Sequence, residues 1–348
     1  MWVNRTLALA AVLSACGGHP SAPVSSAPPV AAPAAVKARS VALPGAPADG
    51  VMLDYIVYEP VHHRVWVPAG GTGKVDVIDA RTLQVTPIDG FPTKEFERRG
   101  QKRTIGPSAA AVGDGVVYIG NRGDASVCAY DSATLAKRTC ATLDSPPDGI
   151  QYVAATKEIW VTTPHDKAIA ILDAATLAAK AGITFAGEPE GFAVDEARGV
   201  FYTNLEDKDQ TLAIDVRSHH VTQTWNPACG EDGPKGLIFD AAANHLVVVC
   251  PDHIETLDPA HDGAVIGKLA VGDGLDNIDY VASRHQLVLA AGRAATLVVG
   301  KLGADGSLTA AATIPTVKGA RNAVIADDGT MFVCDGHAGA ILVVPPVP

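Results

Sequence analysis

Charged side chains recur just ahead of short apolar runs in this chain, at one position of a repeated pattern. The residues at that position are Asp54, Ser108, Asp148, Glu190, Lys235, Asp276 and Arg321. Carboxylates brought together could hold a divalent metal ion, which activates water for hydrolysis. They could also be neutralised by the two cations of the set. The outcome depends on whether the fold gathers these positions.

The apolar runs repeat with a period typical of a β-propeller. Five of them end in Asp and then break into a small polar turn, and most of the spacings between these Asp residues are 42 or 43. The five are Asp79, Asp131, Asp173, Asp215 and Asp258. A fixed period of about 40–50 residues with strand-like segments indicates a propeller. We expect each carboxylate to accept hydrogen bonds from the backbone of its own turn.

A second landmark gives the number of blades. An apolar or aromatic residue lies 13 residues ahead of the first four Asp residues, and the column continues to the end of the chain. It consists of Trp66, Tyr118, Trp160, Tyr202, Val247, Val288 and Phe332. Seven copies predict an all-β, seven-bladed propeller of four-stranded antiparallel blades, because sheets with two apolar faces must stack and close into a ring.

The blades are predicted at residues 51–92, 106–146, 147–187, 188–230, 233–274, 275–319 and 320–344. The last unit stops after three strands, so we expect a segment near residue 40 to supply the fourth and close the ring. Inner strands line the channel of a propeller. The charged positions should therefore surround one channel mouth and form a ligand-binding site. The favoured interpretation is a mutually compensating ring, with Lys235 between Glu190 and Asp276, and Arg321 close to Asp276 and Asp54.

Two segments resemble the YVTN-type β-propeller repeat. They are VWVPAGGTGKVDVIDARTL, residues 65–83, and IWVTTPHDKAIAILDAATL, residues 159–177. The resemblance extends over roughly residues 51–344 and implies the architecture rather than an activity. Residues 275–319 lack the Asp turn, as does the final unit, so the register of blades six and seven is the least specified.

A weaker resemblance points to metal chemistry. PDGI and PEGF, which contain Asp148 and Glu190, are similar to segments of the gluconolactonase and senescence-marker propellers. That resemblance implies a divalent metal cofactor held by Asp148 and Glu190, with Asp276 as a further ligand, and hydrolysis of lactones or esters. Lys235 and Arg321 depart from this pattern because they place cations where a metal would bind.

The cysteines predict two disulfides in an exported protein. Cys128 and Cys140 should face each other across a hairpin of blade two, while Cys229 and Cys250 should meet on one rim. Cys334 is left over, and a free buried thiol is the favoured state.

The N-terminus is similar to a bacterial lipoprotein signal. Leu13-Ser14-Ala15-Cys16 follows a short apolar stretch, which implies a signal peptide over 1–15 and lipidation of Cys16. An ordinary secretory signal is the alternative. Residues 16–40 are rich in Pro, Ala and Ser and predict a tether, and residues 41–348 form the propeller. The expected location is the cell envelope, on the periplasmic face of the outer membrane or on the cell surface.

The rim carries further candidates. His165, His253 and His337 each lie close to an Asp in sequence, and we expect them to be exposed and too far apart for one metal site. The insertion at residues 93–105 carries five basic residues. It is interpreted as a solvated loop, or as a basic lid that folds over the acidic mouth or meets an anionic ligand.

The composition narrows the function. A net charge of −11, with 38 acidic against 27 basic residues, argues against nucleic acid as a partner. Motifs for a nucleophile elbow, a phosphate loop or an HExxH zinc site are missing. The sequence therefore predicts a lipid-anchored binding or scaffolding module for an envelope protein or a small ligand, rather than an enzyme. The alternative is the metal-dependent lactone or ester hydrolase.

Overall fold

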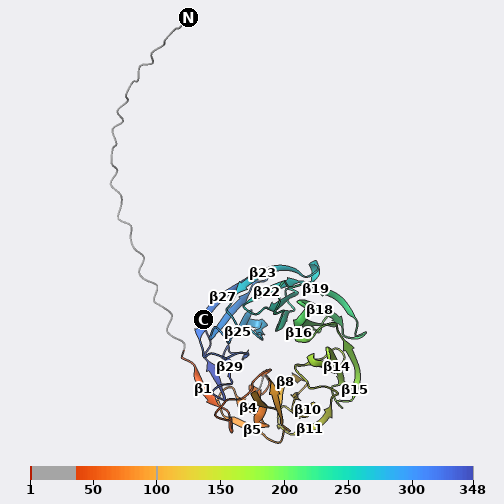
Figure 1. Ribbon diagram of the computed structural model, residues 1–348, viewed down its shortest axis with the longest axis vertical. Coiled ribbons are helices and arrows are strands. Elements are labelled where there is room, and N and C mark those ends of the chain that lie inside the picture. The colour runs from red at the N-terminus through yellow and green to blue at the C-terminus, as the bar shows by residue number, and fades with distance from the viewer. Residues whose placement is uncertain (2–36, 99–100, 348) are drawn as a thin grey trace, which may run out of the picture. The chain divides into compact units, whose positions relative to one another are not determined.

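The chain forms a ring of seven four-stranded antiparallel sheets, the blades of a β-propeller (Figure 1). The structure is a computed structural model and describes residues 1, 37–98 and 101–347. The predicted fold class and number of blades are confirmed. The predicted signal peptide, Cys16 and the tether as far as residue 36 lie outside the described residues.

Each blade contains four strands in sequence order, except that blade seven combines both ends of the propeller. Blade one consists of β2 (Val57–Glu59), β3 (Arg64–Pro68), β4 (Val75–Asp79) and β5 (Val85–Ile88). Blade two consists of β8 (Pro107–Gly113), β9 (Val116–Asn121), β10 (Ser126–Asp131) and β11 (Lys137–Thr142). Blade three consists of β12 (Ile150–Val153), β13 (Glu158–Thr163), β14 (Ala168–Asp173) and β15 (Ala179–Thr184). Blade four consists of β16 (Pro189–Asp195), β17 (Val200–Leu205), β18 (Gln210–Asp215) and β19 (Val221–Trp225). Blade five consists of β20 (Leu237–Asp240), β21 (His245–Val249), β22 (His253–Asp258) and β23 (Ala264–Ala270). Blade six consists of β24 (Asp279–Val281), β25 (Gln286–Ala291), β26 (Thr296–Leu302) and β27 (Leu308–Pro315). Blade seven consists of β28 (Ala323–Ile325), β29 (Met331–Asp335), β30 (Ala340–Val344) and β1 (Arg39–Ala42). Apart from β1, every blade strand falls within the predicted limits of its blade.

The ring is closed by a strand from the N-terminal side, as expected. β1 pairs antiparallel with β30, with Val41 opposite Ile341, and becomes the outermost strand of blade seven (Figure 1). Leu43 follows β1 directly and is buried in the apolar cluster between blades seven and one. One sheet therefore holds both ends of the propeller together.

Apolar side chains fill the spaces between neighbouring blades. The described residues contain seven clusters of buried apolar side chains, one at each interface between blades. The landmark column contributes one residue to every cluster, and each of these residues is at most 3% exposed. At the interface of blades three and four, the rings of Trp160 and Phe201 stack with centroids 4.5 Å apart. Burial of these faces drives the stacking of blades.

The five predicted turn carboxylates accept backbone hydrogen bonds. After β4, Asp79 Oδ1 accepts from the N–H of Arg81 at 2.9 Å and from that of Thr82 at 2.7 Å. The other four carboxylates likewise accept from the N–H two residues on. Because these bonds favour the ionised form, they hold the pKa of Asp79 below its ordinary value.

The insertion between blades one and two is a β-hairpin rather than an irregular loop. β6 (Lys94–Arg98) and β7 (Gln101–Ile105) pair with each other and, within the described residues, with no blade strand. Phe96 is 44% exposed on this hairpin, and Lys94 and Lys102 are exposed as well. Arg99, one of the predicted basic residues, lies outside the described residues.

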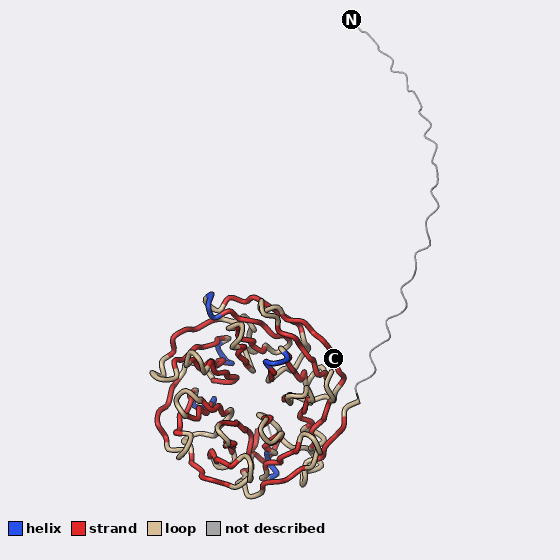
Figure 2. The backbone as a smooth tube through the Cα atoms, turned by 180° about the vertical axis from the view of Figure 1, so that it is seen from behind, coloured by secondary structure: helices blue, strands red, loops and turns tan. Residues whose placement is uncertain are grey.

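In the described part of the chain, helical structure is confined to short turns. The 3-10 turns are η1 (Gly70–Thr72), η2 (Pro164–Asp166), η3 (Glu206–Lys208), η4 (Pro259–His261) and η5 (Ala282–Arg284). Seen from behind in Figure 2, they lie among the loops of the ring. Within the described residues, no helix is long and apolar enough to cross a membrane.

Glycine is required where neighbouring inner strands begin. Gly191 N donates to Lys235 O of the next blade at 3.2 Å, and a Cβ added at Gly191 would lie 2.1 Å from that oxygen. Gly236 N similarly donates to Asp276 O at 2.8 Å, and a Cβ there would lie 2.8 Å from Asn277 Cα. These contacts explain the glycines of the PEGF and PKGL segments by backbone approach between blades.

Replacing Gly191 with Ala should therefore destabilise the propeller by about 1–3 kcal/mol, because backbone rather than a flexible side chain blocks the new methyl group. Gly182→Ala in β15 is a matched control, since its Cβ would meet only Ile169 O at 3.6 Å. Chemical denaturation should show a lower midpoint for the first variant only. Equal midpoints would contradict the close-approach explanation.

Candidate functional site: the charged channel mouth

The inner strands bring most of the predicted charged residues to one end of the ring. We use the term channel mouth for the cluster of Asp54, Asp148, Glu190, Asp276, Arg321 and the additional residue Arg122. Ion pairs join side chains of blades one, two, three, six and seven in this cluster. The charges of Asp54, Asp148 and Asp276 all act on Glu190 of blade four. The predicted convergence is therefore present in the geometry.

Arg122 is the central cation of the mouth, and it was not predicted from the sequence. It follows β9 and lies in the turn before β10, and its Nη2 contacts Asp54 Oδ2 at 3.0 Å and also Asp148 Oδ1. Its side chain is only 19% exposed. Blade two contributes the neutral, buried Ser108 at the inner-strand position, so the loop of the same blade supplies the charge. The two carboxylates raise the pKa of Arg122, against the effect of burial.

Arg321 lies where it was predicted. Its Nη1 is 3.2 Å from Asp276 Oδ2, and its Nη2 is 3.8 Å from Asp54 Oδ1. The next residue, Asn322, donates through Nδ2 to the main-chain oxygen of Asp54 at 3.1 Å and to its Oδ1 at 3.2 Å. Asp54 is therefore held by two arginines and an amide.

Lys235 departs from the prediction. Its Nζ pairs with Glu206 Oε1 at 2.7 Å rather than sitting as the ion-pair partner of Glu190 and Asp276. Glu206 begins η3 on the rim, where its side chain is 37% exposed. An ion pair at that more hydrated position loses less solvation than one inside the mouth. The compensating ring is thus only partly formed.

Glu190 lacks a cationic partner within the described residues. The hydroxyl of Tyr55 donates to its Oε1 at 3.3 Å. Burial, followed by the charges of Asp148 and Asp276, raises the pKa of Glu190 well above its ordinary value. Burial also raises the pKa of Asp148 to about 6, although Arg122 opposes this shift. Negative charge at the mouth is therefore only partly neutralised.

Tyr55 joins blade one to blade four through its side chain, beside Glu190. It belongs to blade one, where its backbone bridges Ala109 of blade two, and its ring stacks on Phe192 of blade four with centroids 5.8 Å apart. This aromatic pair was missed because its members lie far apart in sequence. A cation bound to Glu190 would lie next to aromatic rings as well as carboxylates.

A cavity of about 410 Å³ extends along the inner strands of blades one, six and seven. Asp54, Asn277 and Asn322 line it near the mouth, and Tyr58 and Asp327 also contribute to its lining. Tyr58 donates to Asp327 Oδ2 at 3.3 Å. Asp54 thus contacts both the ion pairs of the mouth and the interior cavity.

The predicted metal ligands do not gather tightly. Among the described residues, one group of three His, Cys, Asp or Glu side chains brings its ligand atoms within 4.8 Å of one another, and it is Cys250, His253 and Glu255. Asp148, Glu190 and Asp276 form no such group. Two of the three pair with arginines instead, Asp148 with Arg122 and Asp276 with Arg321.

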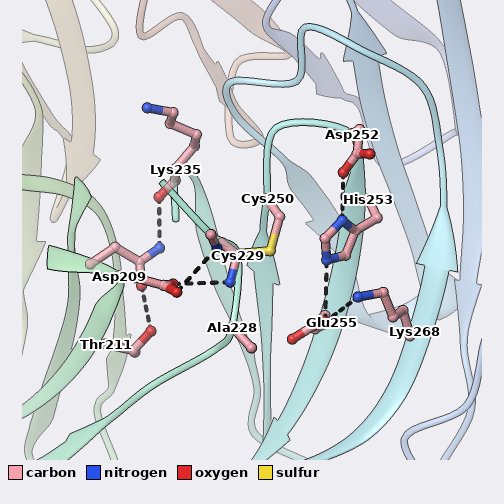
Figure 3. The surroundings of a disulfide bond; sticks show 12 residues. Asp209, Thr211, Ala228, Cys229, Lys235, Cys250, Asp252, His253, Glu255 and Lys268 are labelled. Atoms are coloured by element: carbon pink, nitrogen blue, oxygen red, sulfur yellow. Dashed lines mark hydrogen bonds and ion pairs between the residues drawn. A yellow bond between two sulfur atoms is a disulfide. The ribbon is translucent and has the colours of Figure 1, made fainter. Parts of the chain in front are cut away.

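Both predicted disulfides are present. Cys128 lies directly opposite Cys140 in the β10–β11 register and is bonded to it. Cys229 is bonded to Cys250 and links blades four and five (Figure 3). Cys334 is free and buried, as predicted, and burial raises its thiol pKa.

The rim histidines differ from one another. The side chain of His165 is 87% exposed, and His337 is also exposed, as expected. His253 is only 13% exposed, so the expectation of exposure is wrong for this residue. It opens β22 and is enclosed by Asp252 and Glu255, which lie on either side of its ring (Figure 3).

Comparisons with known proteins support the architecture. No protein-family model matches the chain, and no curated protein does. A chain in the crystal structure of the mitotic checkpoint complex is 13% identical, with a TM-score of 0.70, and the match covers 97% of this chain and 99% of that chain. The RRP9 WD40 repeats are 9% identical, with a TM-score of 0.71 and coverage of 88% and 97%.

A chain of Kuenenia stuttgartiensis hydrazine synthase is 14% identical, with a TM-score of 0.70 and coverage of 84% and 95%. The protein described here is thus similar in structure to seven-bladed propellers, including WD40 proteins. At such low identities the likeness shows the fold alone.

Replacing Glu190 with Gln should stabilise the protein at neutral pH. A carboxyl whose pKa is raised by folding binds more protons in the folded state, so its contribution to stability falls as pH rises above the ordinary value of 4.5. The variant should therefore unfold at a higher temperature than the parent at pH 7. The gap amounts to about 1.4 kcal/mol per unit of pKa elevation and should close as pH falls to 4.5.

Glu97→Gln on the exposed hairpin is the control, and its gap to the parent should not change in this way. A Glu190→Gln gap that stays constant or widens toward low pH would contradict the assignment.

Proposed function

We propose that this protein is a binding module whose channel mouth receives a cationic group of a partner. The observation that carries the proposal is Glu190, a half-buried carboxylate that has no ion-pair partner within the described residues. Four further carboxylates act on it electrostatically, those of Asp148, Asp276, Glu206 and Asp54. A bound cation would relieve this repulsion.

The balance of charge supports a cationic ligand. Asp54, Asp148, Glu190 and Asp276 face two arginines, and Lys235 is occupied by Glu206. Charges in such a partly buried site interact more strongly than in water. Tyr55 and Phe192 add aromatic faces, which favour ammonium and guanidinium groups. The chemistry fits a Lys or Arg side chain, or an organic amine.

The fold is consistent with binding a protein. One neighbour is a chain of the mitotic checkpoint complex, and another consists of WD40 repeats. In this proposal, a partner protein rests on the rim of the propeller and one of its side chains enters the mouth. For the present chain, the YVTN-type family relationship remains a proposal based on its repeat sequences.

The N-terminal sequence supports a location in the cell envelope. Leu13-Ser14-Ala15-Cys16 fits a lipoprotein signal, and the following Pro, Ala and Ser residues fit a tether. The partner would then be another envelope protein or a small ligand in that compartment. Two disulfides are compatible with an oxidising compartment.

Hydrolysis by a bound divalent metal is a separate prediction from the sequence. It is not favoured by Asp148, Glu190 and Asp276, whose ligand atoms do not all lie within 4.8 Å of one another. Mass spectrometry of metals in tag-free protein tests it. Stoichiometric metal that is lost from Asp148→Ala would support a hydrolase.

Binding of an oligolysine peptide should distinguish the channel mouth from other acidic surfaces. We expect fluorescence anisotropy to show saturable, salt-sensitive binding of oligolysine and no binding of oligoglutamate of equal length. Glu190→Gln should weaken the affinity by about tenfold or more, since a hydrogen bond to a charged group contributes about 1.5–3 kcal/mol.

Asp327→Asn is the matched control, because Asp327 lines the cavity from the turn between β28 and β29 on blade seven. It should bind oligolysine like the parent. Unchanged affinity in Glu190→Gln, or equal losses in both variants, would contradict binding at the mouth.

Cys16→Ser should release the protein from the membrane fraction of a Gram-negative cell. The substitution removes the sulfur that would carry the lipid. Intact mass measurement of the parent should show an N-terminus at Cys16 with an added diacylglyceryl group. An unmodified N-terminus together with unchanged fractionation would show that Cys16 is not an anchor.

A further inference from the structure

The disulfide between Cys229 and Cys250 lies in a setting that differs from that of a purely structural bridge. Cys250 is fully buried, and ligand atoms of Cys250, His253 and Glu255 lie within 4.8 Å of one another. In Figure 3, His253 and Glu255 lie beside the disulfide, next to Cys250. Cys229 Sγ is bonded to Cys250 Sγ, so a fourth donor is adjacent.

Glu255 has unused capacity to bind a ligand. Its side chain is 3% exposed, and its Oε1 pairs with Lys268 Nζ at 2.7 Å and with His253 Nε2 at 3.2 Å. Its Oε2 is buried without a hydrogen-bond partner. A buried carboxylate oxygen left in this way carries a desolvation cost that a bound cation would remove.

His253 is oriented as metal-binding histidines are. Asp252 Oδ1 lies 2.6 Å from His253 Nδ1, and the opposite ring nitrogen, Nε2, points toward Glu255 (Figure 3). A carboxylate on one ring nitrogen fixes the tautomer and increases the basicity of the other nitrogen. Asp252 would thus support coordination without being a ligand itself.

We propose that opening of the Cys229–Cys250 disulfide creates a zinc site. Its ligands are the thiolates of Cys229 and Cys250, His253 Nε2 and a carboxylate oxygen of Glu255. Two thiolates, an imidazole and a carboxylate form a donor set suited to four-coordinate Zn²⁺. In the oxidised protein the same sulfurs are bonded to each other and the zinc site does not exist.

The reaction needs a dithiol reductant. Its thiolate attacks the sulfur of Cys229, which is half-exposed, and displaces Cys250 as a thiolate beside His253. The second thiol of the reductant then attacks the mixed disulfide and releases Cys229, so the reductant leaves as a disulfide and both cysteines are reduced. Binding of Zn²⁺ displaces any protons that remain on the thiols.

The backbone around Cys229 keeps the sulfurs near each other after reduction. Cys229 lies in the connection between β19 and β20, and the carboxylate of Asp209 accepts hydrogen bonds from Cys229 N at 3.0 Å and Gly230 N at 3.1 Å (Figure 3). Cys250 follows β21 directly. These hydrogen bonds do not depend on the disulfide.

The other disulfide provides an internal comparison. Cys128 and Cys140 face each other between β10 and β11, and Cys128 packs in an apolar cluster. Within the described residues, neither belongs to a group of potential metal ligands. A Cys128→Ser, Cys140→Ser variant therefore restricts reduction to the bridge of interest.

The test measures zinc in that double variant before and after reduction. Protein is reduced with an immobilised phosphine or dithiol, separated from the reagent without oxygen, equilibrated with Zn²⁺ and desalted. Elemental analysis should find about one zinc per chain after reduction and none before. Replacement of Zn²⁺ by Co²⁺ should give the sulfur-to-cobalt charge-transfer and d–d absorption of a tetrahedral site.

Variants of the remaining ligands complete the test. Glu255→Gln and His253→Ala should each lower the zinc affinity of the reduced protein by at least tenfold, whereas Lys268→Gln should increase it by freeing Glu255. Circular dichroism confirms folding of each sample. The proposal would be overturned by equal zinc contents in oxidised and reduced protein, or by reduced protein that is folded but binds no zinc. It would also be overturned if neither ligand variant changed the zinc affinity.

Discussion

Each blade of this propeller has two apolar faces, and neither can be covered from within the same blade. Neighbouring blades cover these faces in turn, so the last blade must meet the first before all interfaces are buried. Closure through β1 is therefore a condition for the whole fold. It also sets the placement of the inner strands, whose first residues must face a common axis.

The electrostatics of the channel mouth follow from that arrangement. The ring places Asp54, Asp148, Glu190 and Asp276 close enough for each to affect the ionisation of another. Arg122 and Arg321 relieve part of the repulsion, and their positions leave Glu190 without a cation among the described residues. The site most suited to a ligand is thus the place where internal compensation is incomplete.

The repeated Asp turns and the aromatic column were sufficient to predict the blades, because period and side-chain alternation are local properties of the sequence. They also located the starts of the inner strands closely: Glu190 is the second residue of β16, and Asp148 lies two residues ahead of β12. The role of Arg122 could not be predicted in this way, since it comes from a loop outside the repeated register. Tyr55 and Glu206 were missed for a similar reason: their contacts join residues of different blades, and no local pattern encodes them. The insertion was identified as unusual, but the two strands of its hairpin consist mostly of polar and charged residues, so no apolar run marked them as strands.

Closure by β1 also has a mechanical consequence. The chain enters the ring at Arg39 through the outermost strand of blade seven, which has four residues and, within the described part of the chain, pairs with β30 alone. A pull on that part of the chain is transmitted first to this short ladder of hydrogen bonds. Tension and ring integrity are consequently coupled: a force sufficient to peel β1 away would expose one edge of the last blade and loosen the interface that joins it to the first.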